Sequence, residues 1–85
     1  MIPIRTMPHS VRITSSAELG RALRSARRAR RLRLEDVALG AGVGVRFVSE
    51  LERGKPTVRL AETLRVVASL GLLLTIEDSD DRPDA

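Results

Sequence analysis

Cysteine, tryptophan and tyrosine are absent from the sequence, and phenylalanine and histidine each occur once. Without cysteine the chain can form neither a disulfide nor a thiolate metal site, which fits a reducing compartment. The single histidine, His9, lies in a proline-containing N-terminal segment, a poor setting for a catalytic or metal-binding role. No apolar run approaches the ~20 residues of a membrane span, and the N-terminus lacks the long apolar stretch of a secretory signal. We therefore expect a cytoplasmic protein without membrane contact.

Motifs of enzymes and of nucleotide-binding sites are missing as well. The glycine-rich segment Gly40–Gly44 lacks the G-x-G-x-x-G spacing, the preceding strand and the Lys-Ser or Lys-Thr ending of phosphate-binding loops. A turn between helices explains these glycines better. The sequence shows no hydrolytic dyad and no cluster of metal ligands. We therefore expect no enzymatic activity, no catalytic residue, no metal and no cofactor.

The chain is short, and its apolar residues are nearly all Leu, Val, Ala and Ile. Its 85 residues make one small domain with an aliphatic core. A domain of this size buries only a modest core, so association with a partner would help to stabilise it.

Charge is distributed unevenly along the chain. Residues 77–85 carry five acids and one arginine, whereas residues 1–76 carry fourteen basic and six acidic side chains, a net charge of +8. A basic body with a short acidic tail suits a polyanionic partner such as DNA, although a merely solvated surface is the alternative. Fourteen of the fifteen basic residues are arginine, which suits forked contacts to phosphate and guanine.

Hydrophobic periodicity and helix-end signals predict four helices. Ser15 followed by Glu18 is a capping signature at the start of the first helix. Gly42, Gly54 and Gly71 end the second, third and fourth helices. The predicted helices cover residues 16–31, 34–41, 45–53 and 59–70.

The fourth helix and the segment after it carry more apolar surface than one domain needs. Leu60, Leu64, Val67 and Ala68 are expected to face inward, while Thr63, Val66 and Leu70 form a second stripe. After Gly71 comes a β-prone run, LLLTIED, and a lone strand of this length is unstable in water. Its partner is either the N-terminal arm or, more simply, the same strand of a second copy. The expected dimerisation residues are Val66, Leu70, Leu72, Leu73, Leu74, Thr75 and Ile76.

The second and third helices form a helical hairpin with a tight turn. Ala38 is small where the helices cross, Gly42 suits a left-handed turn, and Val48 points inward from the third helix. This pattern is typical of a helix-turn-helix, which presents its second helix to the major groove. The same pattern also occurs in ordinary helical bundles.

The residues around this hairpin are more specific. The stretch from Leu19 to Pro56 resembles the phage-repressor-like (Cro and cI type) helix-turn-helix family. The matching residues are Arg27, Val37-Ala38, Gly42-Val43, Ser49, Glu52 and Gly54. The continuation through LLLTIED looks more like antitoxins of the HipB type, and the resemblance covers about residues 15–77.

The resemblance implies a fold class and a function. The fold would be all-α, with four to five helices and a short C-terminal strand that pairs across a homodimer. The protein would bind a palindromic DNA operator, repress its own operon and neutralise a toxin, by resemblance a HipA-type kinase. Two alternatives are a stand-alone repressor without a toxin and an interaction adaptor that no longer binds DNA.

The resemblance also assigns site residues. Arg46 and Ser49 are the base-edge candidates, with Val45 offering a contact to a thymine methyl; alternatively, Arg46 contacts only phosphate. Arg27 and Glu52 would form an internal ion pair that orients the third helix, the alternative being two exposed charges. The phosphate-contact candidates are Arg28, Arg31, Arg33, Arg53 and Lys55.

Two departures from the family pattern bear on these assignments. Where the family has a Ser or Thr cap followed by Gln, this chain has Arg33 and Leu34, and Leu34 cannot hydrogen-bond to the DNA backbone. Gly44 and Val45 replace polar residues at the start of the third helix. Base reading therefore rests on few side chains.

The chain divides into four expected parts. Residues 1–14 form a flexible N-terminal arm, 15–71 the DNA-binding domain, 72–77 the dimerisation strand and 78–85 an acidic tail. The apolar, cationic arm is expected to dock on the dimer or on the toxin. The acidic tail is expected to lie away from DNA.

Overall fold

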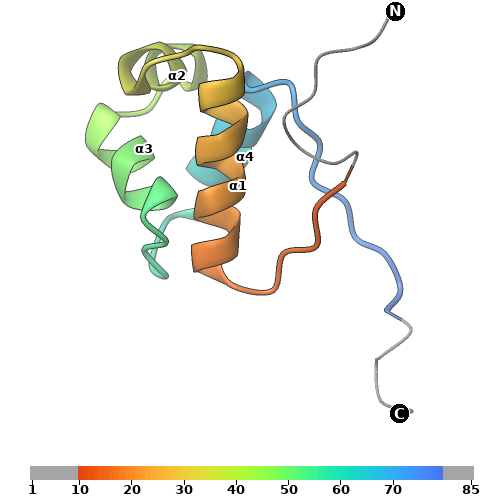
Figure 1. The fold of residues 1–85 in the computed structure, drawn as a ribbon. Helices are drawn as coiled ribbons and strands as arrows, with labels where there is room; N and C mark the ends of the chain where they lie inside the picture. The colour runs from red at the N-terminus through yellow and green to blue at the C-terminus, as the bar shows by residue number, and fades with distance from the viewer. Residues whose placement is uncertain (1–9, 80–85) are drawn as a thin grey trace, which may run out of the picture.

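Four helices follow one another along the chain in a computed structural model that describes residues 10–79 (Figure 1). They are α1 (Ser16–Ala29), α2 (Leu34–Ala41), α3 (Val45–Glu52) and α4 (Leu60–Ser69). Every boundary lies within two residues of its predicted position. No strand occurs within the described range. Residues 1–9, with His9 and most of the predicted arm, and residues 80–85 of the predicted tail lie outside that range.

The predicted helix ends are confirmed by their hydrogen bonds and dihedral angles. The Ser15 hydroxyl accepts a hydrogen bond from the backbone N–H of Glu18 at 3.1 Å and so caps α1. The Glu18 carboxylate turns back and accepts hydrogen bonds from the backbone N–H and the hydroxyl of Thr14. Gly42 ends α2 in the left-handed region, with φ 70°, which a residue without a side chain adopts at little cost.

The core is aliphatic, as predicted. α2 packs against both α3 and α4, and α1 packs against α3. Phe47 is half-buried at the edge of this core, and Leu34 also packs against it. The fully enclosed side chains are Leu23, Ala26, Val37, Ala38, Ala41, Val48, Leu51, Val66, Val67 and Leu70.

The faces predicted for α4 are only partly right: Val67 is buried as expected, but the second stripe faces the core and most of the first does not. Thr63, Val66 and Leu70 are buried in the core of the chain itself, whereas Leu60 and Leu64 are exposed. Thr63 tolerates burial because its hydroxyl donates a hydrogen bond to the carbonyl of Arg59 at 2.7 Å. Both faces of α4 carry apolar residues, so periodicity alone could not choose between them. Val66 and Leu70 are therefore unavailable to a second copy.

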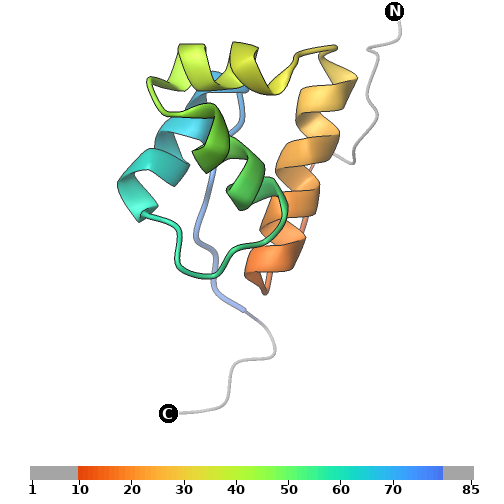
Figure 2. The same ribbon diagram turned by 90° about the vertical axis from the view of Figure 1, so that its left-hand side faces the viewer.

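The segment after α4 has no regular secondary structure through residue 79. The strand expected over residues 72–77 is thus not formed in the single chain. Leu72 packs partly against the core, but Leu73, Leu74 and Ile76 are exposed, and Ile76 is 100% exposed. Figure 1 shows this segment on the side of α1 opposite α3, and the turned view in Figure 2 places α3 in front of it. The chain that follows α4 therefore runs on the side of α1 away from α3.

α1 and α3 approach each other so closely that one helical position must be glycine. A Cβ atom on Gly20 would lie 2.6 Å from the carbonyl oxygen of Leu51 and 2.5 Å from that of Glu52. These neighbours are backbone atoms, which cannot move aside as a flexible side chain can. The hydrophobic pattern of α1 did not single out Gly20, because a missing side chain leaves no periodic signal.

Gly20→Ala should lower the free energy of unfolding by roughly 1–3 kcal/mol, because overpacking two backbones outweighs the ~1 kcal/mol gain in helix propensity. The matched control is Gly40→Ala in α2, where the new Cβ would meet only the Cβ of Ser69 at 3.8 Å. That variant should be more stable than the original protein by about 0.5–1 kcal/mol. Urea denaturation measures both. Stabilisation by both substitutions would contradict the close approach.

Candidate nucleic-acid interface

α3 has one buried and one exposed face. Val48 and Leu51 are buried against the core. Because each residue advances about 100° around a helix, Arg46 and Ser49 point away from the buried side, and Val45 lies at its border. Val45 is exposed, the Arg46 side chain is 90% exposed, and Ser49 is half-buried. The structure thus places the three base-contact candidates within the first five residues of α3, with Arg46 the most exposed of them.

The phosphate-contact candidates lie at helix ends. Arg53 and Lys55 follow the last turn of α3, and Arg33 stands immediately before α2. Arg28 and Arg31 lie in and just after the last turn of α1, and all five residues are exposed. Arg31 is the non-glycine residue with positive φ, 56°, among residues 10–79. A β-carbon is strained in that left-handed conformation.

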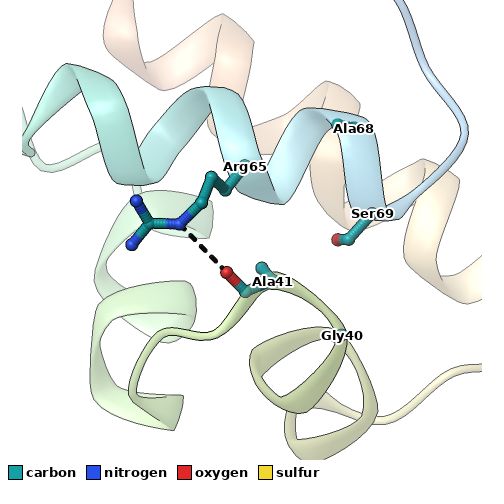
Figure 3. A pocket seen from close by; sticks show the side chains of 5 residues that line it. All are labelled: Gly40, Ala41, Arg65, Ala68 and Ser69. Atoms are coloured by element: carbon teal, nitrogen blue, oxygen red, sulfur yellow. Dashed lines mark hydrogen bonds between the residues drawn. The ribbon is translucent and has the colours of Figure 1, made fainter.

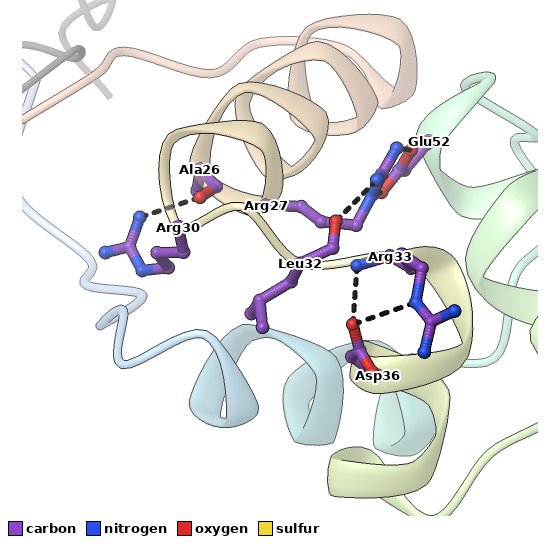
Figure 4. Close-up of polar contacts among 7 residues, drawn as sticks. All are labelled: Ala26, Arg27, Arg30, Leu32, Arg33, Asp36 and Glu52. Carbon is purple, nitrogen blue, oxygen red and sulfur yellow. Dashed lines mark hydrogen bonds and ion pairs between the residues drawn. The ribbon is translucent and has the colours of Figure 1, made fainter.

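Arg27 holds α1, α3 and the α1–α2 turn together, as Figure 4 shows. Its Nε donates to Oε2 of Glu52 at 2.7 Å, and its Nη2 donates to Oε1 of the same carboxylate at 3.0 Å. The remaining terminal nitrogen, Nη1, donates to the carbonyl of Leu32 at 2.9 Å. The side chains are only 12% and 7% exposed, so the alternative of two exposed charges does not hold. The hydrogen bond with Glu52 raises the pKa of Arg27.

Asp36, which the sequence did not single out, accepts a hydrogen bond at the start of α2. The backbone N–H of Arg33 donates to Oδ2 of Asp36 at 2.8 Å, and this bond lowers the pKa of Asp36. The Arg33 guanidinium also lies 3.6 Å from the same oxygen (Figure 4). An acid three residues into a helix was the available signal. Asp36 thus satisfies the backbone N–H of the N-cap residue, whereas no side chain takes the place of the Ser or Thr cap of the family pattern.

Arg30 shows that the basic run around the end of α1 does not point in one direction. In Figure 4 its side chain extends to the side of α1 opposite Arg27 and Glu52. Its Nη1 donates to the carbonyl of Ala26 at 2.9 Å. Arg30 is therefore directed away from the pair that holds α3.

Sequence reasoning also missed Glu50, which lies between two of the candidate contacts. Its Oε2 lies 3.3 Å from Nε of Arg46, and its Oε1 lies 3.2 Å from Nζ of Lys55. The hydrogen bonds from Lys55 and, to a smaller extent, from Arg46 lower the pKa of Glu50, so the carboxylate is ionised at neutral pH. The sequence signal for these pairs was the spacing, because Arg46 lies four residues before Glu50 and Lys55 five residues after it.

A shallow open depression lies between α2 and α4 (Figure 3). Its lining residues are Gly40, Ala41, Arg65, Ala68 and Ser69. Nε of Arg65 donates to the carbonyl of Ala41 at 3.1 Å and so satisfies an end carbonyl of α2. The lining contains no acid–base pair. Within residues 10–79 no three potential metal ligands cluster, and no helix there is long and apolar enough to cross a membrane.

The paired helices α2 and α3, with the outer face of α3 uncovered, define a helix-turn-helix protein. The chain is 40% identical over 65 residues to an uncharacterised HTH-type transcriptional regulator of Sinorhizobium fredii, y4mF, a match that spans 76% of this chain and 86% of that protein. The chain belongs to the family of HTH-type transcriptional regulators. A scan against protein-family models found no match.

Solved structures with the same fold include one described as a HipB–O4 20mer complex and one described as a HipA–HipB–O2–O3 complex. Each superposes with a TM-score of 0.78 at 21% sequence identity, and each match covers 84% of this chain and 100% of the solved chain. At this identity the likeness establishes the fold.

Glu52→Gln should lower the free energy of unfolding by about 3 kcal/mol, because it leaves the Arg27 charge in a mostly buried site without a counter-charge. Glu62→Gln is the matched control, since Glu62 pairs with Arg59 at 2.8 Å but Arg59 is largely exposed. Its cost should stay below about 1 kcal/mol. Urea denaturation at neutral pH measures both. Equal losses would show that the Arg27–Glu52 pair is no more important than a surface pair.

Proposed function

We propose that this protein is a homodimeric, sequence-specific DNA-binding antitoxin that represses its own operon and neutralises a HipA-like toxin kinase. The observation that carries the DNA-binding part is the exposed face of α3, on which Val45, Arg46 and Ser49 are held by the ion pair beneath. The antitoxin part is supported by the likeness of fold to solved structures described as a HipB–O4 20mer complex and a HipA–HipB–O2–O3 complex.

In this proposal α3 enters the major groove with its first half. The Arg46 guanidinium would contact the acceptor atoms of a guanine, Ser49 a second base edge, and Val45 a thymine methyl. No side-chain hydrogen bond caps the N-terminus of α3, where Gly44 stands, so its first amide groups are open to a phosphate.

The surrounding cations would bind phosphates on either side of the groove. Arg53 and Lys55 would contact the backbone beyond the end of α3, and Arg28, Arg31 and Arg33 would do so near the start of α2. The strained conformation of Arg31 supports this role, because glycine would suit the position better unless the charged side chain is needed. The course of the chain after α4, on the side of α1 opposite α3, supports an acidic tail that avoids the DNA.

A second copy of the chain would complete the fold. Leu73, Leu74 and Ile76 expose large aliphatic side chains on a segment with no partner strand among residues 10–79. Pairing of residues 72–77 with their equivalents, with Thr75 in the ladder and Leu72 against the core, would cover these side chains. A two-fold dimer would read a palindromic operator whose half-sites lie about one helical turn apart.

A stand-alone transcriptional regulator without a toxin is the second candidate function. It is supported by the 40% identical relative, which is described as a transcriptional regulator. Purification of the protein expressed from its native operon separates the two functions. Co-purification of the product of a neighbouring kinase gene would support the antitoxin, and its absence from the purified material would support the stand-alone regulator.

Arg46→Ala should flatten the base preference at one position of each half-site, whereas Arg53→Ala should weaken binding to all sequences alike. The expected loss for Arg46→Ala is about 1–3 kcal/mol of discrimination against the wrong base. For Arg53→Ala, the affinity should depend less steeply on salt concentration, by about the equivalent of one phosphate contact. Selection from a randomised duplex pool, followed by salt titrations, measures both. Sequence-independent losses for both variants would mean that Arg46 contacts only phosphate.

Truncation after Gly71 should convert the dimer into monomers or aggregates, because it removes the exposed aliphatic segment. Truncation after Glu77 is the matched control, since it removes the whole acidic tail, residues 78–85, and leaves residues 72–77 in place. That shorter deletion should preserve the dimer. Sedimentation velocity distinguishes the species, and a stable dimer without residues 72–85 would refute pairing through this segment.

A further inference from the structure

One carboxylate holds two of the cations proposed to contact DNA. Glu50 lies on α3 beside the exposed face, and its oxygens lie 3.3 Å from Nε of Arg46 and 3.2 Å from Nζ of Lys55. The Glu50 side chain is only 21% exposed, whereas that of Arg46 is 90% exposed. The more buried Glu50 side chain therefore holds the more exposed Arg46 side chain from one side.

The contact to Glu50 uses Nε of Arg46, and this choice of atom matters for DNA reading. The two terminal nitrogens of the guanidinium extend beyond the anchored Nε and form a fork that matches O6 and N7 of guanine. A guanine edge carries no formal charge, so Arg46 can bind it while keeping Glu50 as its counter-ion. A phosphate is negatively charged, and its approach to Arg46 or Lys55 would be opposed by the neighbouring carboxylate.

We propose that Glu50 is a specificity-determining positioning residue, which directs Arg46 toward a guanine and weakens phosphate binding by Arg46 and Lys55. The proposal rests on the DNA-binding function proposed above. A basic residue in place of Glu50 would attract phosphates, whereas the acidic side chain weakens their binding. Non-specific DNA is bound almost entirely through phosphates, so a residue that penalises phosphate contacts lowers non-specific affinity most.

The competing explanation is that Glu50 only stabilises α3 through a pair with Arg46 at a spacing of four residues. The two explanations differ in their effect on DNA sequence preference. A purely structural pair would change the stability of the protein but leave the ratio of specific to non-specific affinity unchanged.

The test compares Glu50→Gln with Glu62→Gln in the full-length protein. Glu62 is a matched control because its side chain is also 21% exposed, it also pairs with an arginine, and its replacement also removes one negative charge. Fluorescence anisotropy would use two labelled duplexes of about 20 base pairs, enough for two half-sites. One is of random sequence, and the other is the tightest binder selected from a random pool by the unsubstituted protein. Both are titrated over a series of salt concentrations.

Glu50→Gln should bind the random duplex about three- to tenfold more tightly, with a salt dependence steeper by about one contact. Its affinity for the selected duplex should stay the same or fall, so the specificity ratio drops, and the drop should disappear in an Arg46→Ala background. Glu62→Gln should leave the ratio unchanged, and urea midpoints should show that every variant is folded.

Two results would overturn the role of Glu50. The first is an unchanged specificity ratio in Glu50→Gln, and the second is an equal gain in random-duplex affinity for Glu50→Gln and Glu62→Gln, which would reveal a general charge effect. If the unsubstituted protein binds neither duplex in a salt-dependent way, the proposed DNA-binding function itself fails, and this inference fails with it.

Discussion

The attachment of α3 to α1 is the constraint on which the rest of the structure depends. α3 has eight residues, too few for a helix that is stable by itself in water, so it exists because the body holds it. Burial of Val48 and Leu51 supplies the attraction, and Gly20 lets the two backbones come close. The Arg27–Glu52 pair then fixes the orientation, because a forked pair of hydrogen bonds tolerates little rotation.

This attachment leaves the outer side of α3 free for function. Val48 and Leu51 are buried in the core, and Phe47 packs at its edge. The remaining face carries Val45, Arg46 and Ser49. The arrangement separates charges as well. Basic residues border α2 and α3, while the described chain after α4 runs on the side of α1 opposite α3. Acids also occur within the basic surface: Asp36 lies against Arg33, and Glu50 contacts both Arg46 and Lys55.

Much of this organisation could be predicted from the sequence because the signals were local. Helix caps such as Ser15 and turn glycines such as Gly42 act through neighbouring residues, and they placed all four helices within two residues. The internal ion pair came from the family resemblance rather than from spacing. The orientation of α4 could not be predicted, because two apolar stripes competed for the same core. Gly20 was missed because its importance depends on a carbonyl of α3, more than thirty positions away in the chain. The proposed partner of residues 72–77 is a second copy, and one chain cannot display such a contact.

The central claim is that the attachment of α3 presents one defined face of the protein to DNA. Amide NMR chemical-shift mapping during titration with a selected operator duplex tests this claim most directly. The account predicts the largest shifts at residues 44–49, 53–55 and 31–34, with little change at residues 77–79. Shifts concentrated on α4 or on the segment after it, with the α3 amides unmoved, would contradict the account.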